Sequence, residues 1–435
     1  MERMPLEYTV CVGHNIKAVH QESINRLSTA RRELPNMDVL RLPFWKLLAN
    51  VDSGAKLERE LRTFSNRLKR LHLEGVIGLD EHSTALLANM DHSYLNGKKR
   101  TSKRQTRDLP FVKLLNISIT LSPYLSVDSQ LFQTSIQTGL EDFWLSLPSG
   151  PQGRLVPMLT QWKGKYSVKL NITNPKATSW FLDKVDSLHS HLGMEYVILE
   201  GGEGNFFEEQ ASVGDEYIRL LADLAEKIGD NTIVTSGTSH KPLFIRMSAL
   251  QSDWSYSGLK GIIPSLLHHS LLGYHFFIPD AVGGSFSAEL VADDELFVRW
   301  LGIAAFLPVI SFQTPPWVLN LTRFYIAKHH DFVVPLILKY AEEWQEAGHP
   351  IYRPLWWLSP NDPITFTIDD EFLIGDEVLV APVTEKGALQ RDIYLPESAF
   401  QWQDTNNAQV FDGGTFLESY PVGLGDVPVF VRRRS

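Results

Sequence analysis

Residues 175–200, PKATSWFLDKVDSLHSHLGMEYVILE, contain a helix pattern followed by an apolar run, and this unit decides the fold. Asn174 can cap a helix over Pro175–His191, and a proline suits the first turn of a helix. The run Tyr196–Leu199 is short, apolar and rich in β-formers, which predicts a buried strand. Strands separated by helices imply βαβ units and a parallel sheet.

The same alternation extends to both sides of this unit. Further strands are predicted at Val39–Trp45, Gly75–Leu79, Leu114–Leu125, Thr232–Thr235, Leu243–Met247 and Tyr274–Ile278, and further helices at Asp215–Ile228 and Gly258–Leu272. More than about 250 residues of such alternation favours an eight-stranded α/β barrel over a doubly wound sheet. No glycine fingerprint for dinucleotides or phosphates follows any of the predicted strands, which also favours the (β/α)8 TIM barrel.

The two ends of the chain have different patterns. After about Pro354, short strands such as Phe366–Ile368, Val378–Ala381 and Val427–Val431 are separated by turn residues, which predicts an all-β sandwich module. At the other end, Tyr8–Val12 resembles an isolated strand. We therefore expect three parts: an amino-terminal remnant and linker over 1–40, a barrel over 41–353, and a C-terminal β-sandwich domain over 354–435.

Composition excludes several classes of protein. The 435 residues include 51 acidic and 41 basic side chains, a net charge of −10, which argues against a nucleic-acid partner. The single cysteine, Cys11, cannot form a disulfide within the chain. No stretch reaches the roughly 18 apolar residues of a membrane span, and the amino terminus lacks the pattern of a signal peptide. The basic cluster Lys98–Arg107 is either a solvated loop or a patch for polyanions or localisation, and its polarity favours the loop.

Acidic residues follow several of the predicted strands, where a barrel places its catalytic groups. They are Asp80, Glu81, Glu200, Glu203, Asp253 and Asp280, and the tryptophans 162, 254 and 357 are spread among them. Carboxylates bind sugar hydroxyls and aromatic rings pack on sugar C–H faces, so this set fits a carbohydrate pocket. The alternative is that each acid caps a helix and each tryptophan is part of the core.

Metal and serine-hydrolase sites have little support. His268-His269 and His329-His330 are adjacent pairs, whose side chains diverge on a helix instead of converging on one ion. No Gly-x-Ser-x-Gly motif is present. The sequence therefore predicts neither a metal site nor a serine nucleophile.

Three segments carry a resemblance to a known family. They are RPLWWLSPNDPITFTIDDEFLIGDEVLVAPV over Arg353–Val383, LLGYHFFIPDAVGGSF over Leu271–Phe286, and LNITNPKATSWF over Leu170–Phe181. Together with VILEGGEGN they resemble glycoside hydrolase family 31 in collinear order over roughly Arg41–Arg434, most of all its branch of myogenesis-regulating glycosidases.

The resemblance implies a retaining α-glycosidase that acts on α-glucosides, α-galactosides or α-xylosides without a metal or organic cofactor. In that family an aspartate after the fourth strand attacks the anomeric carbon, and one after the sixth strand donates the proton. Here Glu200 stands at the nucleophile position, and its extra methylene moves the carboxylate by more than about 1 Å. A gap-free register places Ala249 at the proton-donor position, so Asp253 is the candidate acid/base.

The resemblance also suggests residues that bind the substrate: Asp80, Glu81, Trp162, Glu203, Arg246, Trp254, Asp280 and Trp357. The family's Asp-Phe-Thr before the fourth strand is here Asn171-Ile172-Thr173. These departures leave a second hypothesis open, a catalytically silent member that binds a glycan or a partner protein. The family further implies the secretory pathway and a β-sandwich ahead of the barrel, of which Glu7–Val12 would be the tail of a shortened chain.

Overall fold

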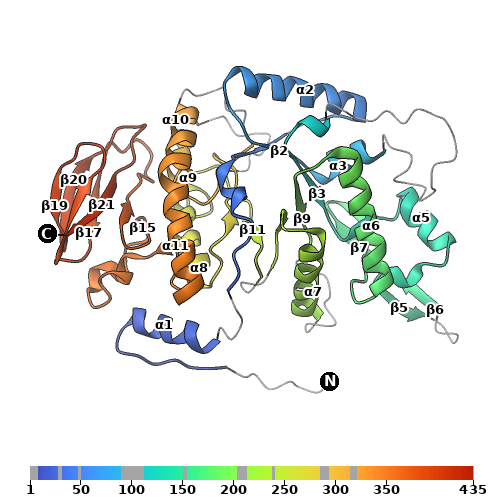
Figure 1. The fold of residues 1–435 in the computed structure, drawn as a ribbon, viewed down its shortest axis with the longest axis horizontal. Helices are drawn as coiled ribbons and strands as arrows, with labels where there is room; N and C mark the ends of the chain where they lie inside the picture. Colours follow the sequence, from blue (N-terminus) through green and yellow to red (C-terminus); the bar gives the residue numbers. More distant parts are fainter. Residues whose placement is uncertain are drawn as a thin grey trace.

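The computed structural model describes residues 8–27, 32–47, 50–89, 112–149, 154–202, 213–237, 241–284, 293–313 and 321–434. An α/β part forms the bulk of the molecule, and a smaller all-β part lies beside it (Figure 1). The basic cluster Lys98–Arg107 and the candidate residue Glu203 lie outside the described residues.

Eight short parallel strands form the central sheet, in the order β12-β11-β10-β9-β3-β2-β1-β13. Their bounds are β1 Phe44–Lys46, β2 Val76–Leu79, β3 Ile117–Leu121, β9 Tyr196–Leu199, β10 Thr232–Val234, β11 Phe244–Arg246, β12 Phe277–Ile278 and β13 Ser311–Phe312. A parallel bridge between Val282 and Phe312 joins the segment after β12 to β13 and nearly closes the sheet on itself. The predicted eight-stranded barrel is confirmed.

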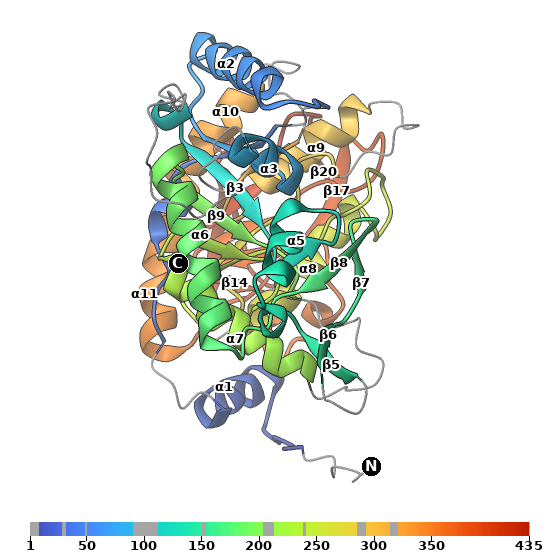
Figure 2. The ribbon, with the colours of Figure 1, turned by 90° about the vertical axis from the view of Figure 1, so that its right-hand side faces the viewer.

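Helices surround this sheet (Figures 1 and 2). They are α2 Gly54–Arg70, α3 Glu81–Asn89, α6 Pro175–Leu192, α7 Val213–Ile228, α8 Ile262–Leu271, α9 Asp294–Ala304, α10 Leu321–Lys328 and α11 Val334–Ala347, with α1 Ile16–Leu27 at the amino-terminal side. Helix α6 begins as predicted, because the Asn174 side chain accepts a hydrogen bond from the Lys176 N–H at 3.0 Å. It ends at Gly193, whose φ of 62° suits a C-terminal cap.

An insertion between β3 and α6 lies against the carboxyl ends of the strands. It contains β4 Tyr124–Ser126, α5 Gln130–Gln137, β5 Ser146–Ser149, β6 Arg154–Pro157, β7 Thr160–Trp162 and β8 Lys165–Lys169. Strands β7 and β8 form a hairpin that pairs with β4. Its turn residues Lys163 and Gly164 both have positive φ, 48° and 78°. A tight turn therefore holds Lys163 at the tip of the hairpin.

The carboxyl-terminal strands form two antiparallel sheets around a separate core. Strands β14 Tyr352–Arg353, β15 Phe372–Ile374, β16 Val378–Val380, β21 Val429–Arg434, β18 Phe400–Asp404 and β19 Val410–Asp412 make one sheet, and β17 Gln390–Leu395 with β20 Thr415–Pro421 makes the other. Leu373, Trp402 and Phe430 are fully buried between them together with Ile393. The boundary predicted at residues 353 and 354 falls beside β14 and remains a prediction.

Four predicted strands differ in the structure. Tyr8–Val12 is not a strand, and Tyr8, Val10 and Val12 are exposed, because no described strand pairs with this segment. Phe366–Ile368 is not a strand but begins at the last residue of a 3₁₀ helix, Pro363–Phe366, whose first turn is capped by Asp362. The run Val39–Trp45 begins in a 3₁₀ helix, Met37–Arg41, and Leu114–Leu125 divides into β3 and β4.

Candidate functional site

A cavity of about 220 Å³ opens at the carboxyl ends of the barrel strands. Three carboxylates line it, Asp80 after β2, Glu200 after β9 and Asp280 after β12. Three cationic side chains also line it: Lys46, Lys163 and Arg246. Since the carboxyl ends of parallel strands meet at one edge of a barrel, residues distant in the sequence converge here.

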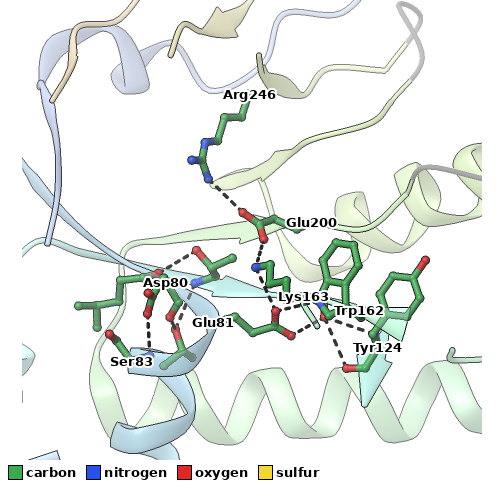
Figure 3. Close-up of polar contacts among 12 residues, drawn as sticks. Asp80, Glu81, Ser83, Tyr124, Trp162, Lys163, Glu200 and Arg246 are labelled. Atoms are coloured by element: carbon green, nitrogen blue, oxygen red, sulfur yellow. Dashed lines mark hydrogen bonds and ion pairs between the residues drawn. The ribbon is translucent and has the colours of Figure 1, made fainter. Parts of the chain in front are cut away.

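Glu200 is held between two cations (Figure 3). Its backbone N–H donates to the Leu121 carbonyl at 2.8 Å, which ties the end of β9 to β3. Arg246 Nη1 lies 3.1 Å from Oε1, and Lys163 Nζ contacts Oε2. The side chain of Glu200 is 16% exposed, so its two oxygens are oriented by these partners more than by water.

The glycines after Glu200 are required by close packing. Gly201 has φ of +88°, and a Cβ at this position would lie 2.7 Å from the Tyr124 ring. A Cβ on Gly202 would lie 2.8 Å from the Cβ of Ser236. The sequence Glu-Gly-Gly therefore lets β4 and the end of β10 approach the backbone beside the carboxylate.

Lys163 also contacts a second glutamate, Glu81. Its Nζ lies 3.1 Å from Glu81 Oε2. Burial acts to lower the pKa of Lys163, but the hydrogen bond to Glu200 and the charges of Glu200 and Glu81 outweigh it and raise this pKa above its ordinary value. The ammonium is therefore a cation shared by two carboxylates.

Trp162 fixes the position of Glu81. Its Nε1–H donates to Glu81 Oε2 at 2.9 Å, and its ring stacks on Tyr124 with centroids 4.4 Å apart. The Ser122 hydroxyl donates to Glu81 Oε1 at 2.5 Å. The hairpin and the β3–β4 segment thus hold both oxygens of Glu81 in place (Figure 3).

Asp280 and Asp80 form the rest of the acidic wall. Burial raises the pKa of Asp280, whereas hydrogen bonds from the backbones of Leu250 and Ala281 partly offset this effect. The bond from Leu250 is 2.7 Å long. Asp80 Oδ1 accepts from the Ser83 N–H at 2.7 Å, so Asp80 both caps α3 and lines the cavity. Lys46 lies on β1, the strand next to β2, and burial lowers its pKa.

Among the described residues predicted from the sequence, five are not in the wall of this cavity: Glu81, Trp162, Asp253, Trp254 and Trp357. Glu81 and Trp162 are still linked to it, because Glu81 contacts the wall residue Lys163 and Trp162 donates to Glu81. Asp253 Oδ1 instead accepts from the backbone N–H and the hydroxyl of Ser255, at 2.8 and 2.6 Å. Trp254 donates to Asp293 at 3.0 Å, and Trp357 is buried against His20 with ring centroids 5.7 Å apart. Ala249, at the register position of the family's acid, is exposed and has no titratable group. The structure thus brings together Asp80, Glu81, Trp162, Glu200, Arg246 and Asp280.

Sequence reasoning missed the two lysines of the site. Lys46 is the last residue of β1, so an inspection of all polar residues at strand ends, instead of acids alone, would have found it. Lys163 is at the tip of a hairpin, and its contact with Glu200 depends on how the insertion folds over the barrel. No periodicity in the sequence points to that contact.

Two kinds of feature are not found among the described residues. No group of three histidine, cysteine, aspartate or glutamate side chains among them could hold a metal ion. Within the same residues, no helix combines the length and the apolar character needed to cross a membrane.

Comparison with known proteins gives a consistent set of relatives. Residues 348–435 match the C-terminal domain of glycosyl hydrolase family 31. The chain is 51% identical to the SITS-binding protein of Tetronarce californica over all of this chain and 63% of that protein. It is 31% identical to the mouse myogenesis-regulating glycosidase over 98% of this chain and 61% of that protein. The chain thus spans about three-fifths of the length of both relatives.

Solved structures support the same fold. The Flavobacterium johnsoniae GH31 dextranase complexed with glucose superimposes with a TM-score of 0.74 and 20% identity, over 97% of this chain and 54% of that one. The cycloalternan-forming enzyme from Listeria monocytogenes also gives 0.74, with 19% identity over 97% of this chain and 43% of that one. At this identity the likeness concerns the fold.

Proposed function

Because the chain belongs to glycosyl hydrolase family 31, we propose that its barrel cavity binds the terminal sugar of an α-glycoside and that Glu200 is the nucleophile of a retaining hydrolysis. The observation that carries this proposal is the position of Glu200, at the end of β9 and in the wall of the cavity. Active sites of α/β barrels are built at this end of the strands.

The contacts of Glu200 suit a nucleophilic role. Arg246 engages Oε1, which leaves Oε2 as the oxygen that attacks the anomeric carbon. Lys163 contacts Oε2, so the sugar has to displace this ammonium before attack. The side chain of Lys163 is 46% exposed and can move into solvent without a change in the barrel.

The remaining wall suits the recognition of hydroxyl groups. Asp80 and Asp280 offer carboxylate oxygens on either side of the cavity, and charged acceptors form strong hydrogen bonds with sugar hydroxyls. Neither Asp80 nor Asp280 by itself distinguishes glucose, galactose and xylose. The proposal therefore covers α-glucosides, α-galactosides and α-xylosides, and the sugar is to be found by experiment.

A covalent label tests the nucleophile. The protein is incubated with fluorinated glycosyl fluorides of the gluco, galacto and xylo series, which trap the glycosyl-enzyme of a retaining glycosidase. We expect an adduct on Glu200 by peptide mass spectrometry, no adduct in Glu200→Gln, and normal labelling in Glu195→Gln, an exposed glutamate on the same chain segment. Absence of any adduct, together with no hydrolysis of aryl α-glycosides, would contradict the proposal.

A second candidate function is glycan or partner binding without turnover. The observation that favours it is the placement of Asp253, whose carboxylate is bound to its own turn and does not line the cavity. In this case a panel of α-linked oligosaccharides would bind, measured by calorimetry, with equal affinity before and after long incubation. The released sugar, measured by chromatography, would remain at the level of the buffer blank.

A further inference from the structure

We propose that Glu81 is the second catalytic carboxyl, the acid and base of the reaction, and that the Lys163 ammonium lies where the anomeric centre of the substrate binds. This inference rests on the proposed hydrolytic function. It replaces Asp253, the acid/base candidate of the sequence, with a residue that contacts the same cation as the nucleophile.

The separation of the two carboxyl groups is limited by their shared partner. Lys163 Nζ lies 3.1 Å from Glu81 Oε2 and contacts Glu200 Oε2. Two oxygens that each bind one nitrogen at hydrogen-bond length can be no more than about 6 Å apart. Retaining glycosidases need carboxyls about 5–5.5 Å apart, and this upper limit on the separation of Glu81 and Glu200 is compatible with that spacing.

The charge between the carboxyls also fits the reaction. The transition state of glycoside hydrolysis resembles an oxocarbenium ion, with positive charge at and next to the anomeric carbon. A site that holds an ammonium between two carboxylates is electrostatically complementary to such a cation. The raised pKa of Lys163 has the same origin, the charges of Glu200 and Glu81.

Glu81 is positioned rigidly for proton transfer. It is the first residue of α3, and its oxygens are held by Ser122 and Trp162. Glu81 is not in the wall of the 220 Å³ cavity but lines a neighbouring cavity of about 420 Å³, whose wall is mostly apolar and includes Tyr124. When Lys163 moves out, Oε2 of Glu81 faces the space that the ammonium leaves.

Hydrolysis takes place in two steps. Once Lys163 has moved away, Glu81 first takes up a proton from the solvent. In the first step, Glu200 Oε2 forms a bond to the anomeric carbon, the glycosidic C–O bond breaks, and the Glu81 proton passes to the leaving oxygen. In the second, the Glu81 carboxylate takes a proton from water, the water oxygen bonds to the anomeric carbon, and Glu200 leaves as a carboxylate. Both glutamates return to their starting protonation states.

Substrates with poor and good leaving groups distinguish an acid/base role of Glu81 from a purely structural role. In Glu81→Gln, hydrolysis of a methyl α-glycoside, which needs acid assistance, should fall by at least about 100-fold. Formation of the glycosyl-enzyme from the 2,4-dinitrophenyl α-glycoside of the same sugar, which needs none, should stay within about threefold of wild type. In Glu81→Ala, sodium azide should restore turnover and give the α-glycosyl azide. Glu195→Gln is the matched control, and thermal unfolding checks that each variant is folded.

The outcomes distinguish this inference from the proposed function. If Glu200 is labelled but Glu81→Gln hydrolyses both substrates like wild type, the role of Glu81 is overturned and the nucleophile stands. If Asp253→Asn shows the leaving-group pattern and azide rescue instead, the acid is Asp253. If wild type yields no adduct and no product, the hydrolytic function fails, and the role of Glu81 fails with it.

Discussion

At Gly201 the backbone and the neighbouring ring leave no room for a side chain. The φ of +88° costs an L-residue about 1 kcal/mol, and the Tyr124 ring lies where a Cβ would point. Because Gly201 follows Glu200 directly, its conformation sets the direction of the carboxylate. The proposed nucleophile is thus positioned by a residue with no functional group.

The change Gly201→Ala tests this positioning. We expect the free energy of unfolding to fall by about 2–4 kcal/mol, about 1 from the positive φ and the rest from the contact with Tyr124. Labelling of Glu200 should slow by more than tenfold. Gly139→Ala is the matched control, because Gly139 has φ of +76° and open space around its Cβ position. Equal effects of the two changes in urea unfolding would show that the ring contact is unimportant.

At the scale of elements, the β7–β8 hairpin supplies two side chains of the site. It brings Trp162 to Glu81, 81 residues away in the sequence, and Lys163 to Glu200, 37 residues away. Trp162 links hairpin and barrel by both a ring stack and a hydrogen bond. The hairpin is therefore a structural part of the site.

Two changes at Trp162 separate the stack from the hydrogen bond. Trp162→Phe keeps a ring on Tyr124 and removes the donor to Glu81. We therefore expect the free energy of unfolding to fall by about 1 kcal/mol. Trp162→Leu removes both the ring stack and the hydrogen bond, and should lower the free energy of unfolding by about 0.5–1.5 kcal/mol more. Hydrogen exchange in Thr160–Lys169 measures the loosening, and Tyr166→Phe, at an exposed ring of β8, is the control. A leucine variant that exchanges no faster than the phenylalanine variant would argue against the stack.

At the scale of the whole molecule, buried neutral histidines couple stability to pH. Burial lowers the pKa of His275 to about 3, helped by the charges of His20, Arg353 and Arg32. Burial also lowers the pKa of His329 to about 4, although its Nε2–H donates to the carbonyls of Leu307 and Pro308. Both values lie below 6.5, so the unfolded chain binds protons first as the pH falls.

The resulting stability is complete above about pH 6.5 and is lost as the pH falls toward 4 and 3. At pH 5 each histidine should cost about 2 kcal/mol relative to pH 7. His329→Gln keeps a donor for the two carbonyls and does not titrate, so its free energy of unfolding should fall by about 2 kcal/mol less than that of wild type between these pH values. Urea unfolding at pH 7 and pH 5 measures the difference, and identical slopes for both proteins would contradict the prediction.

The sequence determined the elements of this protein. Helix α6, strand β9 and the position of Glu200 at its end follow from local patterns, because capping residues and apolar runs act within a few residues of each other. The sheet order and the carboxyl-terminal module follow from the alternation of strands and helices and from turn-separated strands. The prediction of a strand at Tyr8–Val12 was wrong, because a strand needs a partner and a local pattern does not supply one.

Only the tertiary structure decided which side chains meet. Asp253 and Glu81 both follow barrel strands and look equivalent in the sequence, yet one carboxylate binds its own turn and the other shares an ammonium with Glu200. The difference arises from the hairpin, whose pairing with β4 is non-local and places Lys163 and Trp162 beside Glu81. Local sequence sets where a strand ends, whereas packing of distant segments sets what its last residue touches.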